Sequence, residues 1–213
     1  MNNSSKYSIN TKSLAIGYGD SQDFSSIQNN LNLKLKRGEL CCLIGPNGVG
    51  KSTLLKTLSA QIKANDGDIL INGLLLEEYT PQLLAKEISV VLTETIHVSN
   101  LKVKELVAMG RFPYTNFWGK LSQEDERLVE EALTTLGLTS LADRDYIELS
   151  DGEKQKALIA KALAQNTPII LLDEPTAFLD FPSKMSILAE LRTIAHAKNG
   201  SIVLSTHDLE LAL

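Results

Sequence analysis

The sequence GPNGVGKST at residues 45–53 decides the fold of this chain. It has the spacing of a phosphate-binding loop, in which a glycine, four residues and then Gly-Lys-Ser lie between a strand and a helix. Glycines let successive backbone N–H groups converge on phosphate oxygens, and the helix N-terminus adds unpaired donors and a partial positive charge. The apolar run Leu40–Ile44 before it predicts a buried strand, and helical spacing follows it. The alternative is a glycine-rich turn that precedes a helix by chance.

Length and composition favour one large domain or two closely packed lobes, since 213 residues with 43% hydrophobic content can bury a core. The net charge of −5, without a basic stripe, gives no reason to expect nucleic-acid binding. No apolar run reaches the roughly 18 residues of a membrane span, and the N-terminus lacks the apolar stretch of a signal peptide. Cys41 and Cys42 point to opposite faces of the expected strand, which favours packing over a disulfide or a metal site. We therefore expect a protein of the reducing cytoplasm.

The residues before the loop predict an antiparallel β layer. Residues 7–17 alternate loosely, and Leu31, Leu33 and Leu35 alternate cleanly with polar residues up to the turn at residues 37–38. Tyr18 lies between two glycines, where its ring could stack on a purine base or be an ordinary loop residue.

Residues 101–145 change to helical spacing, with a Ser122 cap at the start of one helix and Gly137 at its end. An aromatic stretch at residues 111–119 interrupts the helical pattern. Two interpretations stay open for it, an exposed interaction surface or a loop packed on its own helices.

Two carboxylates follow the apolar run Ile169–Leu172, because the next residues are Asp173 and Glu174. They lie at the carboxyl end of an expected strand, where α/β sheets place their ligands, and adjacent acids there are costly unless a cation meets them. His207 stands just beyond the next apolar run, at residues 201–205. Taken alone, such a histidine is more often structural than catalytic.

Together these motifs, in this order, resemble the ATP-binding-cassette (ABC) ATPases from about Tyr18 to the last residue. The resemblance implies an α/β fold: a P-loop NTPase core with a mostly parallel sheet and flanking helices, an N-terminal antiparallel β layer and a helical subdomain insert. It implies a nucleotide-binding core at residues 1–93 and 166–213 and the helical subdomain at about 94–165.

The resemblance also implies roles for individual residues. Tyr18 stacks on adenine, Asp173 holds Mg²⁺, Glu174 is the general base for the attacking water, and His207 senses the γ-phosphate. Leu179 and Asp180 fall in the acidic loop that contacts the partner of a dimer. The phosphate loop binds the triphosphate of ATP, with Lys51 on the β- and γ-phosphates and Ser52 on Mg²⁺; it comprises Gly45, Pro46, Asn47, Gly48, Val49, Gly50, Lys51, Ser52 and Thr53.

The segment LSDGE at residues 149–153 stands where the family has Leu-Ser-Gly-Gly-Gln. In the family this segment binds the γ-phosphate of ATP held by the opposite subunit of a head-to-tail dimer, so Ser150 and Gly152 are expected to bind nucleotide. Asp151 and Glu153 bring negative charge near that anion, and we expect Asp151 to point away. Glu94 is the expected counterpart of the glutamine that ligates Mg²⁺ and links hydrolysis to the permease, with Thr93 as the alternative.

The helical insert resembles that of the ATPases of iron-siderophore, haem and cobalamin importers. This implies an ATPase on the cytoplasmic face of the inner membrane, docked on permease subunits. A substrate-binding protein delivers the transported substrate to the permease from the other side. A soluble cassette protein with a regulatory, translation or repair role and a P-loop kinase are the competing hypotheses. The chain ends six residues after His207, where the family continues, so a fragment is expected.

Overall fold

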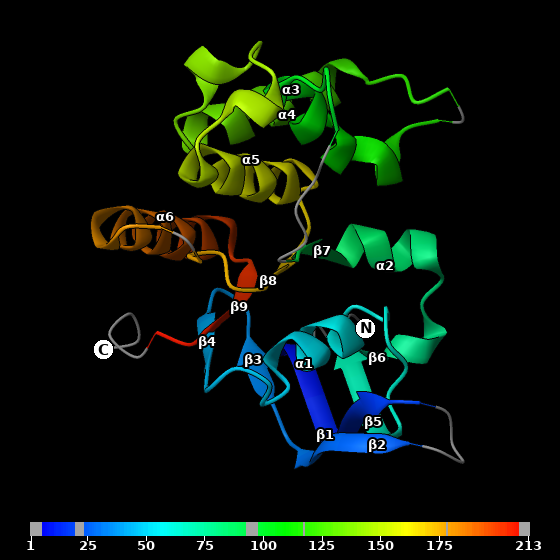
Figure 1. Cartoon of the computed structure of the whole chain (residues 1–213). Helices are drawn as coiled ribbons and strands as arrows, with labels where there is room; N and C mark the ends of the chain where they lie inside the picture. Colours follow the sequence, from blue (N-terminus) through cyan, green and yellow to red (C-terminus); the bar gives the residue numbers. More distant parts are fainter. Residues whose placement is uncertain (1–5, 20–23, 93–97, 117, 178, 209–213) are drawn as a thin grey trace.

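Two β-sheets organise the chain in the computed structural model, which describes residues 6–19, 24–92, 98–116, 118–177 and 179–208 (Figure 1). The antiparallel sheet has the order β2-β1-β5-β6, with β3 also paired to β1. The second sheet has the order β4-β9-β8-β7, and its strands are all parallel. The strands are β1 (Tyr7–Tyr18), β2 (Ser25–Leu31), β3 (Lys34–Lys36), β4 (Leu40–Ile44), β5 (Asp66–Ile71), β6 (Leu74–Leu75), β7 (Ile88–Val91), β8 (Ile169–Leu172) and β9 (Ser201–Thr206).

The helices begin at the residues that the capping signals indicate. The side chains of Thr80, Ser122 and Ser150 each accept a hydrogen bond from a backbone N–H of the first turn of a helix, which confirms the start predicted at Ser122. The helices are α1 (Lys51–Leu58), α2 (Pro81–Glu87), α3 (Val103–Ala108), α4 (Gln123–Thr135), α5 (Asp151–Ala164) and α6 (Phe181–Lys198), with short 3₁₀ helices η1 (Leu76–Glu78), η2 (Met109–Tyr114), η3 (Thr139–Leu141) and η4 (Tyr146–Glu148).

The parallel sheet separates two hydrophobic cores, because successive side chains of a strand point to opposite faces. Leu171 and Val203 pack with α1 and the antiparallel sheet, so α1 lies between the two sheets (Figure 1). Leu172 and Leu204 pack on the other face against α3, α4, α5 and α6. This α/β architecture confirms the predicted parallel core, antiparallel layer and helical insert.

The two cysteines illustrate the alternation along β4. Cys41 packs against the core that holds α1, and Cys42 packs against the core of the long helices. Burial raises the pKa of both thiols, which keeps them in the unreactive neutral form. The prediction of packing cysteines on opposite faces is confirmed.

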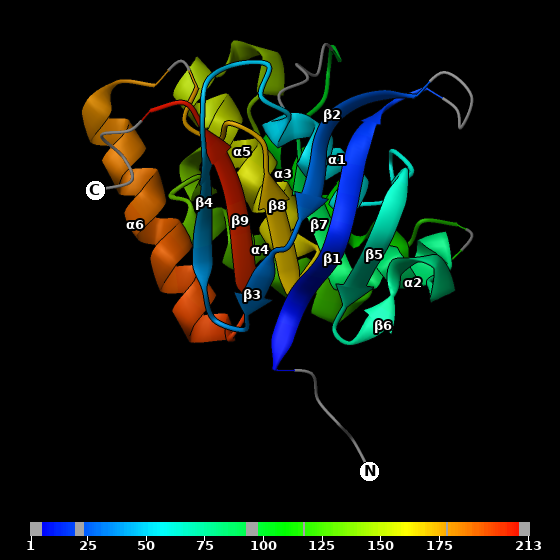
Figure 2. The ribbon, with the colours of Figure 1, turned by 90° about the horizontal axis from the view of Figure 1, so that it is seen from below.

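One strand prediction was wrong in detail, and one alternating run is divided between two strands. Leu40–Ile44 is only half-buried, because β4 ends the order of the described sheet and α6 covers it from one side (Figure 2). The leucine alternation from residue 31 to residue 35 does not belong to one strand. It is divided between β2 and β3, which pair with different halves of β1, while the Leu33 N–H donates to the Thr11 hydroxyl between them.

The aromatic stretch at residues 111–119 fits both interpretations in part. Arg111 is buried, where it pairs with Asp125 at 2.8 Å and lies 4.0 Å over the Tyr114 ring. Phe112 and Trp118 are instead 59% and 85% exposed. One side of the stretch is therefore packed into the helical region, and the other presents aromatic rings to solvent.

The carboxyl end of α5 joins the helical region to the rest of the protein. Arg111 Nη1 donates to the carbonyls of Ala164 and Gln165 at 2.8 and 3.0 Å. The Gln165 side-chain amide donates to the carbonyls of Ala85 and Ile88, which belong to α2 and β7. Among the described helices, none is long and apolar enough to cross a membrane.

Candidate ATP site at the end of the parallel sheet

The phosphate-loop sequence forms the predicted strand, loop and helix. β4 ends at Ile44, and α1 begins at Lys51. Gly50 has φ +105°, a left-handed conformation that favours glycine, and a Cβ added to it would lie 2.7 Å from Ile27 Cγ2. Only glycine therefore fits at this position, where the loop packs against β2 just before α1 begins.

The Lys51 side chain folds back over the loop. Its ammonium donates to the carbonyls of Gly45 and Pro46 at 2.7 and 3.0 Å, and it lies 3.9 Å from Glu174 Oε1. The side chain is only 8% exposed, so the loop holds one cation between its own carbonyl groups and a carboxylate. A phosphate that entered the loop would meet this ammonium as a ready partner.

A pocket of about 560 Å³ lies over the loop and the start of α1. Tyr18, the last residue of β1, is 51% exposed and forms one wall, and its hydroxyl lies 3.2 Å from Thr53 Oγ1. The residues that line the pocket are Tyr18, Ile27, Asn47, Gly48, Gly50, Lys51, Ser52, Thr53, Glu174 and Ala177. Predicted residues thus meet there from β1, the phosphate loop and the end of β8.

The two acids after β8 have different environments. Asp173 is 2% exposed, and its Oδ1 accepts a hydrogen bond of 2.7 Å from the Ser205 hydroxyl. The same hydroxyl accepts a bond of 2.8 Å from the Glu174 N–H. Glu174 has φ +47°, an uncommon conformation outside glycine, and its carboxylate reaches the pocket. Ser205 therefore fixes both acids from the neighbouring strand.

His207 lies beside Glu174. Its Nδ1 is 3.4 Å from Glu174 Oε1, and its side chain is 51% exposed. The next residue, Asp208, pairs with Lys184 of α6 at 2.6 Å. This ion pair ties the segment that holds His207 to the first turns of α6.

Ser150 and Gly152 lie at the start of α5 and do not line this pocket. A Cβ added to Gly152 would lie 3.3 Å from Leu179 Cδ2, so the segment at residues 149–153, called the signature segment below, packs against the loop that precedes α6. Asp151 is exposed, with Oδ1 3.9 Å from Lys154 Nζ. Its carboxylate thus turns along the helix toward a cation, which agrees with the expectation that it points away from the helix end.

Sequence reasoning missed Ser205, Ile27 and Gln28. Gln28 Nε2 donates to the Val49 carbonyl at 3.2 Å, so β2 braces the phosphate loop beside the Ile27 contact. Ser205 could have been noticed because it lies two residues before the predicted site residue His207. The sequence of β2 contains no signal that Ile27 and Gln28 contact the phosphate loop. Glu94 and Thr93 lie outside the described residues.

Comparisons with known proteins place the chain in a family. The family model described as "ABC transporter" matches residues 28–177. The iron(3+)-hydroxamate import ATP-binding protein FhuC of Bacillus subtilis is 38% identical over 205 residues, which cover 96% of this chain and 75% of the relative.

Solved structures give the same result. A metal-chelate type ABC transporter in an inward-facing conformation superposes with a TM-score of 0.82 at 30% identity, covering 97% of this chain and 76% of that one. A dimeric ATP-binding cassette in a post-hydrolysis state, bound to ADP and Pi, has a TM-score of 0.82 at 27% identity, with 96% and 90% covered. The chain therefore belongs to the ABC transporter family, and it is one of the ATPase subunits of that family.

Proposed function

We propose that this ATPase hydrolyses ATP with Mg²⁺ to drive import of an iron chelate, haem or cobalamin through a membrane permease. The observation that supports the chemistry most directly is the meeting of Lys51, Glu174 and His207 at one edge of the pocket. The import direction and the chelate class rest on relatives such as the iron(3+)-hydroxamate import protein. A soluble cassette protein is the less favoured alternative.

The pocket suits a nucleoside triphosphate in size and in chemistry. We propose that the exposed ring of Tyr18 stacks on adenine while the loop amides and Lys51 bind the phosphates. Lys51 exchanges its bonds with the Gly45 and Pro46 carbonyls for bonds with phosphate oxygens. The loop is thus expected to close on the triphosphate from residue 45 to residue 53.

The residues beside the pocket fit a magnesium ion. Mg²⁺ prefers oxygen ligands and uses few from the protein when phosphates supply others. The Ser52 hydroxyl lines the pocket, and the Asp173 carboxylate lies next to Glu174 at the strand end. We assign these two residues, and Glu94 from the segment after β7, to the ion. When bound, the ion neutralises charge on the phosphate oxygens.

Hydrolysis follows from the position of Glu174. Its carboxylate accepts a proton from a water molecule, whose oxygen attacks the γ-phosphorus. The bond from that phosphorus to the bridging oxygen of ADP breaks, and inorganic phosphate leaves. Lys51 and the loop amides stabilise the charge on the transferred group, while His207 holds the γ-phosphate against Glu174.

We propose that the active form is a head-to-tail homodimer, in which Ser150 and Gly152 of one subunit complete the pocket of the other. In this structure both residues lie at the start of α5, outside the pocket of their own chain, as a shared site requires. The dimeric cassette bound to ADP and Pi supports this arrangement. Residues 1–93 and 166–213 would form the core, and about 94–165 the subdomain that presents the signature segment.

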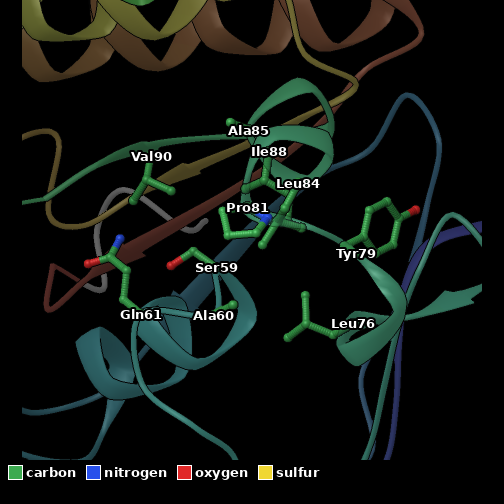
Figure 3. A pocket seen from close by; sticks show the side chains of 10 residues that line it. All are labelled: Ser59, Ala60, Gln61, Leu76, Tyr79, Pro81, Leu84, Ala85, Ile88 and Val90. Atoms are coloured by element: carbon green, nitrogen blue, oxygen red, sulfur yellow. The ribbon is translucent and has the colours of Figure 1, made fainter. Parts of the chain in front are cut away.

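A second pocket is our candidate for permease docking. It has a volume of about 280 Å³ and lies between the end of α1, η1, α2 and β7 (Figure 3). Its walls are mainly apolar, and they comprise Ser59, Ala60, Gln61, Leu76, Tyr79, Pro81, Leu84, Ala85, Ile88 and Val90. Because α1 begins at the phosphate loop and ends at this pocket, a partner bound here would be linked mechanically to the nucleotide.

The helix η2, which carries the exposed residue Phe112, lies beside this candidate surface. Lys86 of α2 lies 5.3 Å from the Tyr114 ring, so the aromatic stretch adjoins the helix that lines the pocket. The permease would place the subunit on the cytoplasmic face of the inner membrane. A substrate-binding protein would deliver the chelate from the other side.

Two experiments test the proposed function. Glu174→Gln should keep ATP binding and lower hydrolysis by about 10²–10⁴-fold, since it removes the base alone. Retained hydrolysis would reject the mechanism. Leu76→Asp should abolish copurification with the permease subunits while basal ATP hydrolysis persists; the exposed Glu77→Gln is the matched control. Copurification that survives Leu76→Asp would reject this docking site.

A further inference from the structure

The N-terminus of α5 is closed by a side chain of its own first turn. One oxygen, Glu153 Oε2, accepts a hydrogen bond of 2.7 Å from the Ser150 hydroxyl and one of 2.9 Å from the Ser150 N–H. In return, the Glu153 N–H donates to Ser150 Oγ at 3.3 Å. This is a complete capping box, with a carboxylate at the third position of the helix.

The carboxylate of Glu153 stays ionised at neutral pH. Hydrogen bonds from the Ser150 hydroxyl and the Ser150 N–H hold the pKa of Glu153 below its usual value. Asp151, the other acid of this turn, points toward Lys154 and makes no described contact with Ser150. The two acids of the segment therefore differ, because only Glu153 holds the serine hydroxyl.

A serine hydroxyl has a single proton to donate. In this structure the proton goes to Glu153 Oε2, and a phosphate oxygen of a second molecule would need the same proton. A hydrogen bond to a carboxylate is about twice as strong as one to a neutral acceptor, and the negative charge of Glu153 also repels a phosphate. Nucleotide held by a partner subunit must therefore displace Glu153 before Ser150 can bind it.

We propose that Glu153 is a latch on the signature helix, which competes with the partner subunit's ATP for the Ser150 hydroxyl and so weakens ATP-dependent dimer closure. This inference rests on the proposed head-to-tail dimer. In addition to that dimer, it assigns to Glu153 the role of raising the ATP concentration that dimer closure needs. Each subunit contains this Glu153–Ser150 contact before it meets its partner.

Glu153→Gln is the decisive variant, because glutamine also completes a capping box but carries no charge. The helix start is kept, while the hold on the hydroxyl and the repulsion of phosphate both weaken. Asp151→Asn is the matched control, since it removes the same charge from the same turn at a side chain that does not reach Ser150.

The experiment measures the dimer dissociation constant by sedimentation in saturating ATP, with Glu174→Gln present in every protein to stop hydrolysis. Glu153→Gln should tighten the dimer by about tenfold or more, as expected when a charged hydrogen bond is replaced by a neutral one. Asp151→Asn should change the constant by less than about twofold. ATP affinity of the monomer, measured in dilute solution, should not change in either variant, because the latch acts only on the partner's nucleotide.

Three results would overturn the latch. A dimer constant that Glu153→Gln leaves unchanged rejects it while the proposed function stands. Equal tightening by Asp151→Asn would show that net charge, and not the hold on Ser150, sets the closure. ATP binding without dimerisation in all variants would reject both the latch and the shared site, whereas loss of ATP binding in the Glu174→Gln parent would reject the proposed function itself.

Discussion

The starts of α1 and α5 are built in opposite ways, although both face the same kind of ligand in the proposed dimer. α1 begins after Gly50 and has no acidic residue in its first turn, whereas α5 begins with a reciprocal cap and contains two acids there. The first helix keeps its donors open and places Lys51 beside them, so it is ready for an anion. The second pairs the N–H groups of Ser150 and Glu153 within its own first turn, so the Ser150 hydroxyl must exchange partners to bind an anion. The N-terminus of a helix can thus either bind an anion directly, as at α1, or be occupied by a side chain that the anion must displace, as at α5.

The largest expected effect is on the open helix end. Lys51→Ala removes the buried ammonium from the loop, and we expect hydrolysis to fall by at least about 10²–10³-fold, as for other preorganised groups that stabilise transferred charge. ATP affinity should fall as well. Isothermal titration and a phosphate-release assay would measure both effects, with the exposed Lys63→Ala as the control. Hydrolysis that survives Lys51→Ala would contradict the proposal that Lys51 at the start of α1 binds the phosphates.

The pair Gly50→Ala and Gly48→Ala tests whether the open end depends on close packing. Both glycines have positive φ, but an added Cβ meets Ile27 at 2.7 Å only at Gly50, whereas at Gly48 it meets nothing within 4 Å. We expect Gly50→Ala to cost about 2–4 kcal/mol of stability and Gly48→Ala about 1 kcal/mol. Urea unfolding would compare them. Equal losses would mean that backbone strain alone matters, and that β2 does not brace the loop.

Ser205→Ala tests the support behind the acids. The change leaves Asp173 buried without its hydroxyl partner, which should cost about 1–3 kcal/mol of stability and lower hydrolysis by about tenfold. Ser201→Ala is a matched control, because this buried serine of the same strand bonds to the Lys36 carbonyl at the other end of β9. The control should lower thermal stability without a specific loss of turnover. If both variants lose the same activity at equal stability, Ser205 does not position the acids.

The smallest expected effect concerns the pH dependence of the closed helix end. Because the pKa of Glu153 is lowered in the folded protein, its contribution to stability is present above the usual carboxyl pKa of 4.5 and is lost as the pH falls below that value. For an exposed pair the contribution is a few tenths of a kcal/mol. Unfolding free energies from pH 7 to pH 3 should show this component in the wild type and not in Glu153→Gln. An identical pH profile in the two proteins would contradict the cap as described.

Much of the fold could be predicted because its signals are local. The loop glycines, the capping residue Ser122 and the acids after β8 all act within a few residues of their place in the chain. Non-local features could not be found in this way. The half-buried state of β4 depends on which strand stands at the end of the described sheet, and sequence periodicity does not contain that information.

The site follows the same division. Tyr18, Lys51, Glu174 and His207 were found from motifs, and the structure brings them together around one pocket or beside it. Ser205 was missed, because the bond between its hydroxyl and Asp173 joins residues 32 positions apart. The roles assigned to these residues remain proposals, and the substitutions above test those of Lys51, Glu174 and Ser205.

The bonds of Gln165 to Ala85 and Ile88 have a mechanical consequence. They attach the carboxyl end of α5 to α2 and β7. A rotation of the helical region relative to the sheet would therefore have its centre near Gln165. With a rise of about 1.5 Å per residue, the start of α5 lies roughly 21 Å from this centre. A turn of about 10° would then carry Ser150 through roughly 4 Å, more than the length of a hydrogen bond. The position of the Gln165 amide thus sets how far Ser150 moves for a given rotation of the helical region.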